Sequence, residues 1–161
     1  MSKVEADDIT DAAGTGAPTF SQGIEGVTDA SSAGSGNVGE FVESASGTVT
    51  LDTTTRDVRS ISLTAGDWDV TGRITTTSGS AADNLVMSIS TTSVTHGTAG
   101  KTLMYWNVND DTGGASSHSG GELSNVRINV SSTTTVYLVA DVNAGGGAGI
   151  FQAYMSARRV R

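Results

Sequence analysis

Two histidines are the residues of this sequence best suited to acid–base chemistry or to metal binding. His96 and His118 lie in segments rich in Gly, Ser and Thr, and neither has a second histidine or a repeated carboxylate nearby. Two isolated histidines make a poor metal site, because zinc sites in proteins use three or four ligands. We therefore expect no metal ion, no cofactor and no catalytic role at either position.

Two clusters of acids and glycines fall short of established binding motifs. The run Asp-Asp-Thr-Gly-Gly at 110–114 lacks the D-x-D-x-D-G spacing of a calcium loop. The glycines at 145–149 precede no Lys-Ser/Thr pair and open no predicted helix, so they are typical of a loop between strands and not of a phosphate cradle. The serines form no G-x-S-x-G nucleophile elbow. We interpret both clusters as surface loops.

Catalysis by residues that are distant in the sequence is the remaining enzymatic alternative. A Ser, a His and an Asp could meet in space, but no pattern in the sequence favours such a meeting. Two carboxylates in a groove could hydrolyse a polysaccharide of the host surface, although only 5% of the residues are aromatic and available to stack on sugars. We predict that the protein is not an enzyme and that it has no catalytic residues.

Composition and charge narrow the class of partner. The chain has 161 residues, which allows one domain plus an appendage. Its net charge of -8 argues against nucleic acid, which needs a cluster of Lys and Arg. Cysteine is absent, and no signal-peptide core or apolar run long enough to span a membrane is visible. We expect folding in a cytoplasm, with no nucleic-acid or membrane partner.

Apolar residues alternate with polar ones from Gly47 onward, between clusters of Gly, Ser, Thr, Asn and Asp. This alternation predicts eight strands, near residues 48–51, 58–64, 67–75, 84–91, 103–108, 123–130, 134–142 and 150–158. No window keeps a helical period. The pattern is typical of an antiparallel sandwich or barrel and not of βαβ units.

The stretch 59–75 is the centre of this arrangement. Ile61 and Leu63 alternate before a break at 65–67, and Trp68 and Val70 alternate after it, which predicts a hairpin or a sharp corner with one buried face. We expect a core that contains Trp68, Val70, Leu85, Met87, Ile89, Leu138 and Phe151. Asp67 and Asp69 flank the tryptophan, so we interpret them as solvated turn carboxylates.

Three residues form a surplus of apolar side chains on the opposite faces of two predicted strands. They are Tyr137, Val139 and Tyr154. Because one face of a small antiparallel sheet normally meets water, this surplus predicts that subunits pack there as a cyclic homo-oligomer.

The N-terminal part, residues 1–45, reads differently from the head, residues 46–161. Its apolar residues are scattered among Gly, Ala, Ser and acids, and the stretch 12–24 cannot bury enough surface to offset its ordering entropy alone. We interpret it as an extended arm with a flexible linker, ordered by a partner through Val4, Ile9, Pro18, Phe20 and Ile24. A disordered tail is the alternative.

Four stretches of the head and one of the arm carry a resemblance. They read ISLTAGDWDVTG at 61–72, LVMSISTTS at 85–93, SSTTTVYLVA at 131–140, AYMSARRVR at 153–161 and DDITDAAGTGAPTFSQGI at 7–24. Together they resemble a family of small virion proteins of tailed bacteriophages, of the head-decoration, head-fibre and short-tail-fibre type. The likeness covers most of the chain.

This resemblance implies a jelly-roll head, similar to the trimeric heads of tumour necrosis factor and complement C1q. In those heads a core aromatic follows an Ala-Gly turn, as Trp68 does here, and apolar strand faces meet around a threefold axis. The chain departs from large tail fibres in lacking a repetitive or coiled-coil shaft.

The predicted function is accordingly structural. We expect a trimeric capsid decoration protein or head fibre, assembled in the host bacterial cytoplasm, whose arm docks on the major capsid protein or another virion protein. The outward loops are predicted at 76–83, 93–101, 109–122 and 143–149. The alternative is a tail fibre or receptor-binding protein that recognises a host surface glycan or receptor through Tyr105, Trp106 and loop 109–122.

Overall fold

The computed structural model describes residues 32–78, 84–97, 103–107, 120–143 and 149–161. All of them belong to one compact unit, from Ser32 to Arg161. This unit begins earlier than the sequence analysis placed the head, because a short strand at Phe41–Glu43 pairs with the last strand of the chain. The expected contact residues of the arm, Val4, Ile9, Pro18, Phe20 and Ile24, lie outside the described residues.

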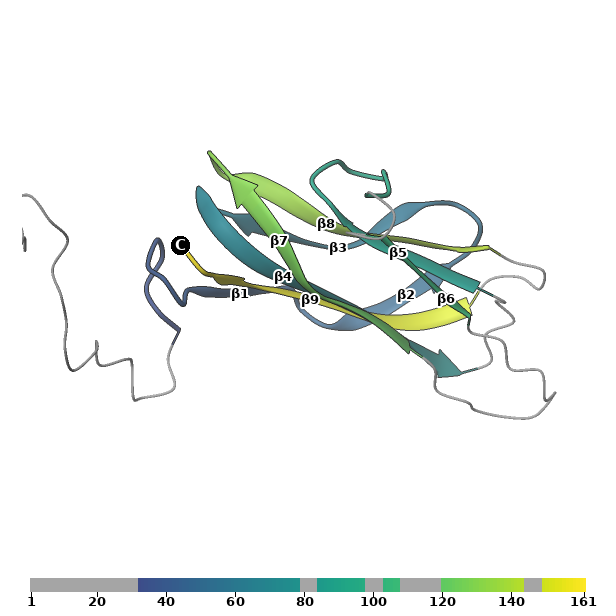
Figure 1. Cartoon of the computed structure of the whole chain (residues 1–161). Coiled ribbons are helices and arrows are strands. Elements are labelled where there is room, and N and C mark those ends of the chain that lie inside the picture. The colour runs from purple at the N-terminus through teal and green to yellow at the C-terminus, as the bar shows by residue number, and fades with distance from the viewer. Residues whose placement is uncertain (1–31, 79–83, 98–102, 108–119, 144–148) are drawn as a thin grey trace, which may run out of the picture. The chain divides into compact units, whose positions relative to one another are not determined.

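The described unit is an all-β protein of two antiparallel sheets (Figure 1). One sheet has the order β1-β9-β4-β7, with β2 also on β9; its strands are β1 (Phe41–Glu43), β2 (Gly47–Leu51), β4 (Gly66–Ser78), β7 (Gly120–Val130) and β9 (Gly149–Arg159). The other sheet has the order β3-β8-β5-β6; its strands are β3 (Arg56–Leu63), β5 (Asn84–Ser90), β6 (Leu103–Asn107) and β8 (Thr134–Asn143). The strand positions expected from alternation agree closely with eight of these strands. β1 was not predicted, because three residues are too few for a periodic signal.

The strands pair in a nested pattern. β2 pairs with β9, β3 with β8, β4 with β7, and β5 with β6. Consecutive strands from β2 to β5 alternate between the two sheets, and so do those from β6 to β9. The chain is therefore arranged as one long antiparallel hairpin, with its tip between β5 and β6, folded so that alternate strand pairs lie in opposite sheets.

The turn at residues 64–66 is a corner between the sheets and not a hairpin. β3 pairs with β8, whereas β4 pairs with β7 and β9, so the two strands leave the turn in different sheets. Gly66 has a φ of 149°, and a Cβ built there would lie 1.8 Å from Nη1 of Arg159. Only glycine fits both requirements. Trp68 follows directly, and its indole Nε1 donates to the Thr64 carbonyl at 3.0 Å.

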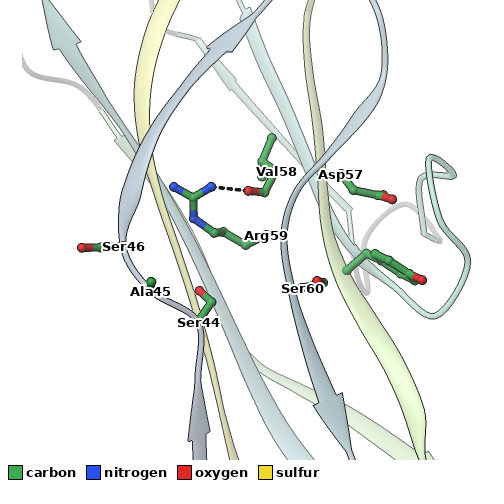
Figure 2. A pocket seen from close by; sticks show the side chains of 8 residues that line it. Ser44, Ala45, Ser46, Asp57, Val58, Arg59 and Ser60 are labelled. Atoms are coloured by element: carbon green, nitrogen blue, oxygen red, sulfur yellow. Dashed lines mark hydrogen bonds between the residues drawn. The ribbon is translucent and has the colours of Figure 1, made fainter.

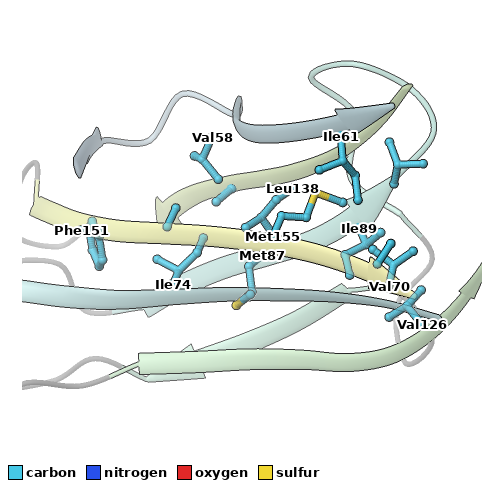
Figure 3. Close-up of a cluster of buried hydrophobic side chains, with 14 of the residues drawn as sticks. Val58, Ile61, Val70, Ile74, Met87, Ile89, Val126, Leu138, Phe151 and Met155 are labelled. Carbon is cyan, nitrogen blue, oxygen red and sulfur yellow. The ribbon is translucent and has the colours of Figure 1, made fainter. Parts of the chain in front are cut away.

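The core fills the space between the sheets (Figure 3). Its largest fully buried side chains include Trp68, Phe151, Leu138 and Met155. All seven residues that the sequence placed in the core are buried. Alternation succeeds here because every strand that contributes has one face toward the other sheet.

Candidate functional site

The chain end is held by a buried arginine, and we call this set of contacts the C-terminal clamp. The Arg159 side chain is only 4% exposed, and its guanidinium lies 4.4 Å from the ring centre of Trp68. It donates to Glu40 Oε2 at 3.0 Å, to the Ala65 carbonyl at 2.6 Å and to the Thr64 hydroxyl. A buried arginine is stable only when its charge and its donors are matched, and here they are matched by a carboxylate, a carbonyl, a hydroxyl and an aromatic face.

Glu40 is the carboxylate at the centre of the clamp. Burial raises its pKa, but hydrogen bonds from the Gly36 amide, from Arg159 and from Ser35 outweigh this effect, so the pKa of Glu40 lies below its usual value. Its backbone is fixed as well, because the Arg159 amide donates to the Glu40 carbonyl at 2.9 Å. The clamp thus joins the segment that enters the sandwich to the strand that ends it.

Asp67 extends the clamp, and the expectation that it is a solvated turn carboxylate is wrong. Its side chain is 5% exposed. Oδ2 accepts from Arg127 Nη2 at 2.5 Å and from Arg161 Nε at 2.9 Å, and hydrogen bonding to Arg127 above all holds the pKa of Asp67 below its usual value. Alternation placed this side chain opposite Trp68. It could not show that Arg127, from β7, and the chain end cover that position.

A second polar cluster joins three distant residues on the outer face of β5 and β8. His96 Nδ1 lies 2.9 Å from Ser88 Oγ, and His96 Nε2 lies 2.7 Å from Asp141 Oδ2. Thr55 Oγ1 donates to the same Oδ2 at 2.7 Å, and the Gly97 amide donates to Ser88 Oγ at 3.2 Å. A Ser, a His and an Asp therefore do meet in this protein, which no sequence pattern indicated.

The environment of Ser88 argues that this cluster is structural. A serine nucleophile must present its oxygen to a substrate, but Ser88 is 0% exposed and its oxygen is hydrogen bonded on two sides. The cluster instead fastens residues 91–97, which we call the connection segment, across the sheet. The signal in the sequence was Asp141, an acid at an outward position of β8.

The connection segment also corrects the expected subunit interface. Asp57 accepts from Ser93 Oγ at 2.6 Å and from the Val94 amide at 2.7 Å. Asp57 and Ser88 are the two partners of Val139 in the strand register, so the segment is tied down on both sides of that valine. Val139 is accordingly 0% exposed and is covered by its own chain.

The two tyrosines of the expected interface lie in different sheets. Tyr137 is half-buried on β8, and Tyr154 is half-buried on β9. The Tyr154 hydroxyl donates to Glu43 Oε2 at 2.5 Å, and this bond raises the pKa of Tyr154. The three expected interface residues therefore do not form one continuous apolar face.

Two concave regions are candidates for ligand binding. The larger, which we call the edge groove, has a volume of about 600 Å³ and lies where β3 approaches the β1–β2 connection (Figure 2). It is lined by Ser44, Ala45, Ser46, Asp57, Val58, Arg59, Ser60 and Tyr137. The smaller, which we call the side pocket, has a volume of about 310 Å³ and is lined by Thr53, Val86, His96, Leu103, Tyr105, Asp141 and Val142.

Of the two predicted receptor-contact residues, Tyr105 is 68% exposed at the side pocket. The side chain of Trp106 lies outside the described residues, as do the tips of most predicted outward loops. Within the described parts of the chain, no three His, Asp or Glu side chains gather closely enough to hold a metal ion. No helix there is long and apolar enough to cross a membrane.

Comparison with known proteins adds no relative. No protein-family model, no curated protein and no solved structure matches this chain. The functional argument therefore depends on the fold, the clamp and the two concave regions.

Proposed function

We propose that this protein is a structural component of a bacteriophage virion, a capsid decoration protein or head fibre. The observation that carries the proposal is the C-terminal clamp, which fixes the point where the N-terminal segment enters the sandwich. Gly39 donates to the Arg159 carbonyl at 2.9 Å, and Glu40 pairs with the Arg159 side chain. A segment anchored in this way can hold a folded domain on a particle.

We assign the sandwich to the jelly-roll type. The nested pairing and the alternation of consecutive strands between sheets support this assignment, since a jelly roll has eight strands in two sheets with Greek-key connections. Jelly rolls recur in viral capsid proteins and in lectins. That recurrence is an analogy of fold, and it suggests a viral role. The way in which the protein would be attached to a particle is argued from the clamp.

The N-terminal segment is the proposed docking element. Before Ser32 it carries six acids, Glu5, Asp7, Asp8, Asp11, Glu25 and Asp29, and one base, Lys3. Its partner is therefore a basic surface of the major capsid protein or of another virion protein. Contacts of this kind weaken as salt screens them, so attachment should decrease between low and high ionic strength.

The proposed assembly is a homotrimer. In a cyclic trimer each subunit uses two different surfaces, and the partly exposed tyrosines Tyr137 and Tyr154 lie in different sheets and so suit such an arrangement. Three acidic segments on one trimer would bind together, which strengthens attachment through effective concentration. Sedimentation of the full chain tests this: a trimer is expected, and a stable monomer at high protein concentration would contradict it.

The protein acts in this proposal without catalysis, and the buried Ser88 supports that view. A receptor-binding protein of the tail is the second candidate, favoured by one observation. Tyr105 stands exposed beside the carboxylate of Asp141 and the imidazole of His96, which is a suitable surface for a sugar ring. A glycan array probed with the intact protein separates the two, because a decoration protein of the proposed kind needs no glycan signal.

Deletion of residues 2–30 tests the docking role. The deleted protein should keep the thermal stability of the sandwich and lose its incorporation into particles when it is supplied to phage that lack the native copy. A matched variant in which the six acids of the segment are replaced by their amides should fold equally and incorporate poorly. Full incorporation of the deleted protein would overturn the docking proposal.

A further inference from the structure

The edge groove contains an arginine in an unusual setting. Arg59 extends from β3 across the open edge of the sandwich (Figure 2). Its Nε donates to the Ala153 carbonyl of β9 at 3.1 Å, and Nη1 donates to the Val58 carbonyl at 2.5 Å. Gly47 of β2 leaves space for the remaining nitrogen, because a Cβ there would lie 2.6 Å from Nη2.

The charge of Arg59 has no carboxylate partner among the described residues. Its two acceptors are neutral carbonyl oxygens. Asp57 is the one acid among the described residues that line the groove, and both of its oxygens hold Ser93 and Val94 of the connection segment. Neutral donors hold Asp57 just as neutral acceptors hold Arg59, so neither charge forms an ion pair among the described residues. An anion that enters on the Arg59 side of the groove would give this half-buried cation a charged partner.

The rest of the groove is suited to hydroxylated ligands. Ser44 and Ser60 provide hydroxyl groups, although the Ser44 oxygen already accepts from the Met155 amide at 3.0 Å, and Tyr137 provides an aromatic ring and a phenol. The volume of about 600 Å³ falls within the range of small-molecule sites. We propose that the edge groove binds an acidic sugar, with the sugar carboxylate on Arg59, its hydroxyls on the serines and its ring against Tyr137.

The groove is less suited to an added polypeptide strand. Strand addition needs free backbone groups on the edge strand, but Arg59 already occupies the Val58 carbonyl. The register of β3 also shifts between Asp57 and Arg59, which marks a bulge, and bulges at an edge impede pairing with another strand. A sugar carboxylate therefore fits this groove better than the carboxylate of an acidic peptide.

The experiment is a titration of the full chain with glucuronate, and with glucose at matched ionic strength, followed by NMR of the Tyr137 ring. Glucuronate should bind with a dissociation constant on the order of 1 mM, and glucose should bind at least about tenfold more weakly, because the charge-assisted bond to Arg59 is missing. Equal responses to the two sugars, or no response to glucuronate, would overturn the proposal.

Two variants localise the effect. Arg59→Gln removes the charge, and Ser60→Glu leaves Arg59 in place but introduces a competing carboxylate into the groove, so both should abolish the preference for glucuronate. Arg158→Gln is the matched control, since this exposed arginine of β9 makes no ion pair among the described residues; it should bind like the wild type. If Arg59→Gln proves unstable, the Ser60→Glu variant tests the proposal by itself: a preference for glucuronate that persists in this variant would overturn it.

An acidic tetrapeptide serves as the competing ligand. It should bind more weakly than glucuronate to the wild type. Binding of the peptide that depends on Arg59, without binding of glucuronate, would replace the sugar by a protein partner. All the residues that line the groove belong to the unit Ser32–Arg161, so we expect deletion of residues 2–30 to leave glucuronate binding unchanged.

Discussion

The C-terminal clamp and the edge groove place the same kind of side chain in two different settings. Arg159 and Arg59 both bridge to neighbouring elements, but Arg159 is buried against a carboxylate and an aromatic ring, whereas Arg59 is half-buried against neutral carbonyls. The first arginine is complete within the fold. The second forms no ion pair among the described residues. This difference separates a structural contact from a candidate binding site.

Removal of the two arginines should have unequal effects on stability. Arg159→Ala leaves Glu40 buried without its cation, so we expect a loss of about 3 to 5 kcal/mol in the free energy of unfolding. Arg59→Ala removes two hydrogen bonds at a site that water can reach, so we expect a loss of about 1 to 2 kcal/mol. Urea unfolding measures both. Equal losses would remove the distinction between the two sites.

Acid should weaken the clamp. The pKa values of Glu40 and Asp67 are lowered from 4.5 and 3.8, so the unfolded chain binds these protons more readily than the folded one. Their contribution to stability is complete above the ordinary values and is lost as the pH falls through the lowered ones. Unfolding followed from pH 6 to pH 2 should show this decline, and the double variant Glu40→Gln, Asp67→Asn should show a smaller one.

The role of Asp57, which lines the edge groove, can be tested by removing its hold on the connection segment. Asp57→Asn removes the charge that holds Ser93 and the Val94 amide, so we expect a loss of about 1 kcal/mol and faster hydrogen exchange at Val94. Asp52→Asn is the control, because among the described residues the Asp52 side chain bonds to Thr54 and Arg56 beside it and not to the connection segment. Exchange at Val94 that is unchanged in Asp57→Asn would show that the segment is held by other contacts.

The smallest effect is expected on the outer face of the other sheet. Tyr154→Phe removes the bond to the exposed Glu43, and a contact of this kind is worth less than about 1 kcal/mol. In the wild type the same bond raises the pKa of Tyr154. Glu43→Gln should therefore lower that pKa, as read from tyrosinate absorbance at alkaline pH, with Tyr154→Phe identifying the signal.

The sequence predicted the strands and the core well because alternation reports which side of a strand faces the opposite sheet. It also placed a corner or hairpin before Trp68, and the corner is the correct alternative. Alternation cannot report what covers an outward residue. For that reason Asp67 and Val139 were assigned to water and to a neighbouring subunit, although Arg127 and the connection segment cover them.

The candidate sites could not be predicted from the sequence for a related reason. Ser88, His96 and Asp141 meet only because β5 and β8 are neighbours, and the connection segment then folds back over them. Arg59 has no unusual sequence context; its setting arises where the edge of β3 approaches β9 of the other sheet. Pairings between distant strands create both sites, and no local spacing encodes them.

The most direct test of the central claim is the location of the protein on intact phage particles. Antibodies raised against the folded sandwich should label the particles in electron microscopy, with the label distributed over the capsid. Label at the tail tip alone would contradict capsid decoration and favour receptor binding through Tyr105. Particles that carry no label, although the protein is abundant in the infected cell, would contradict a virion role altogether.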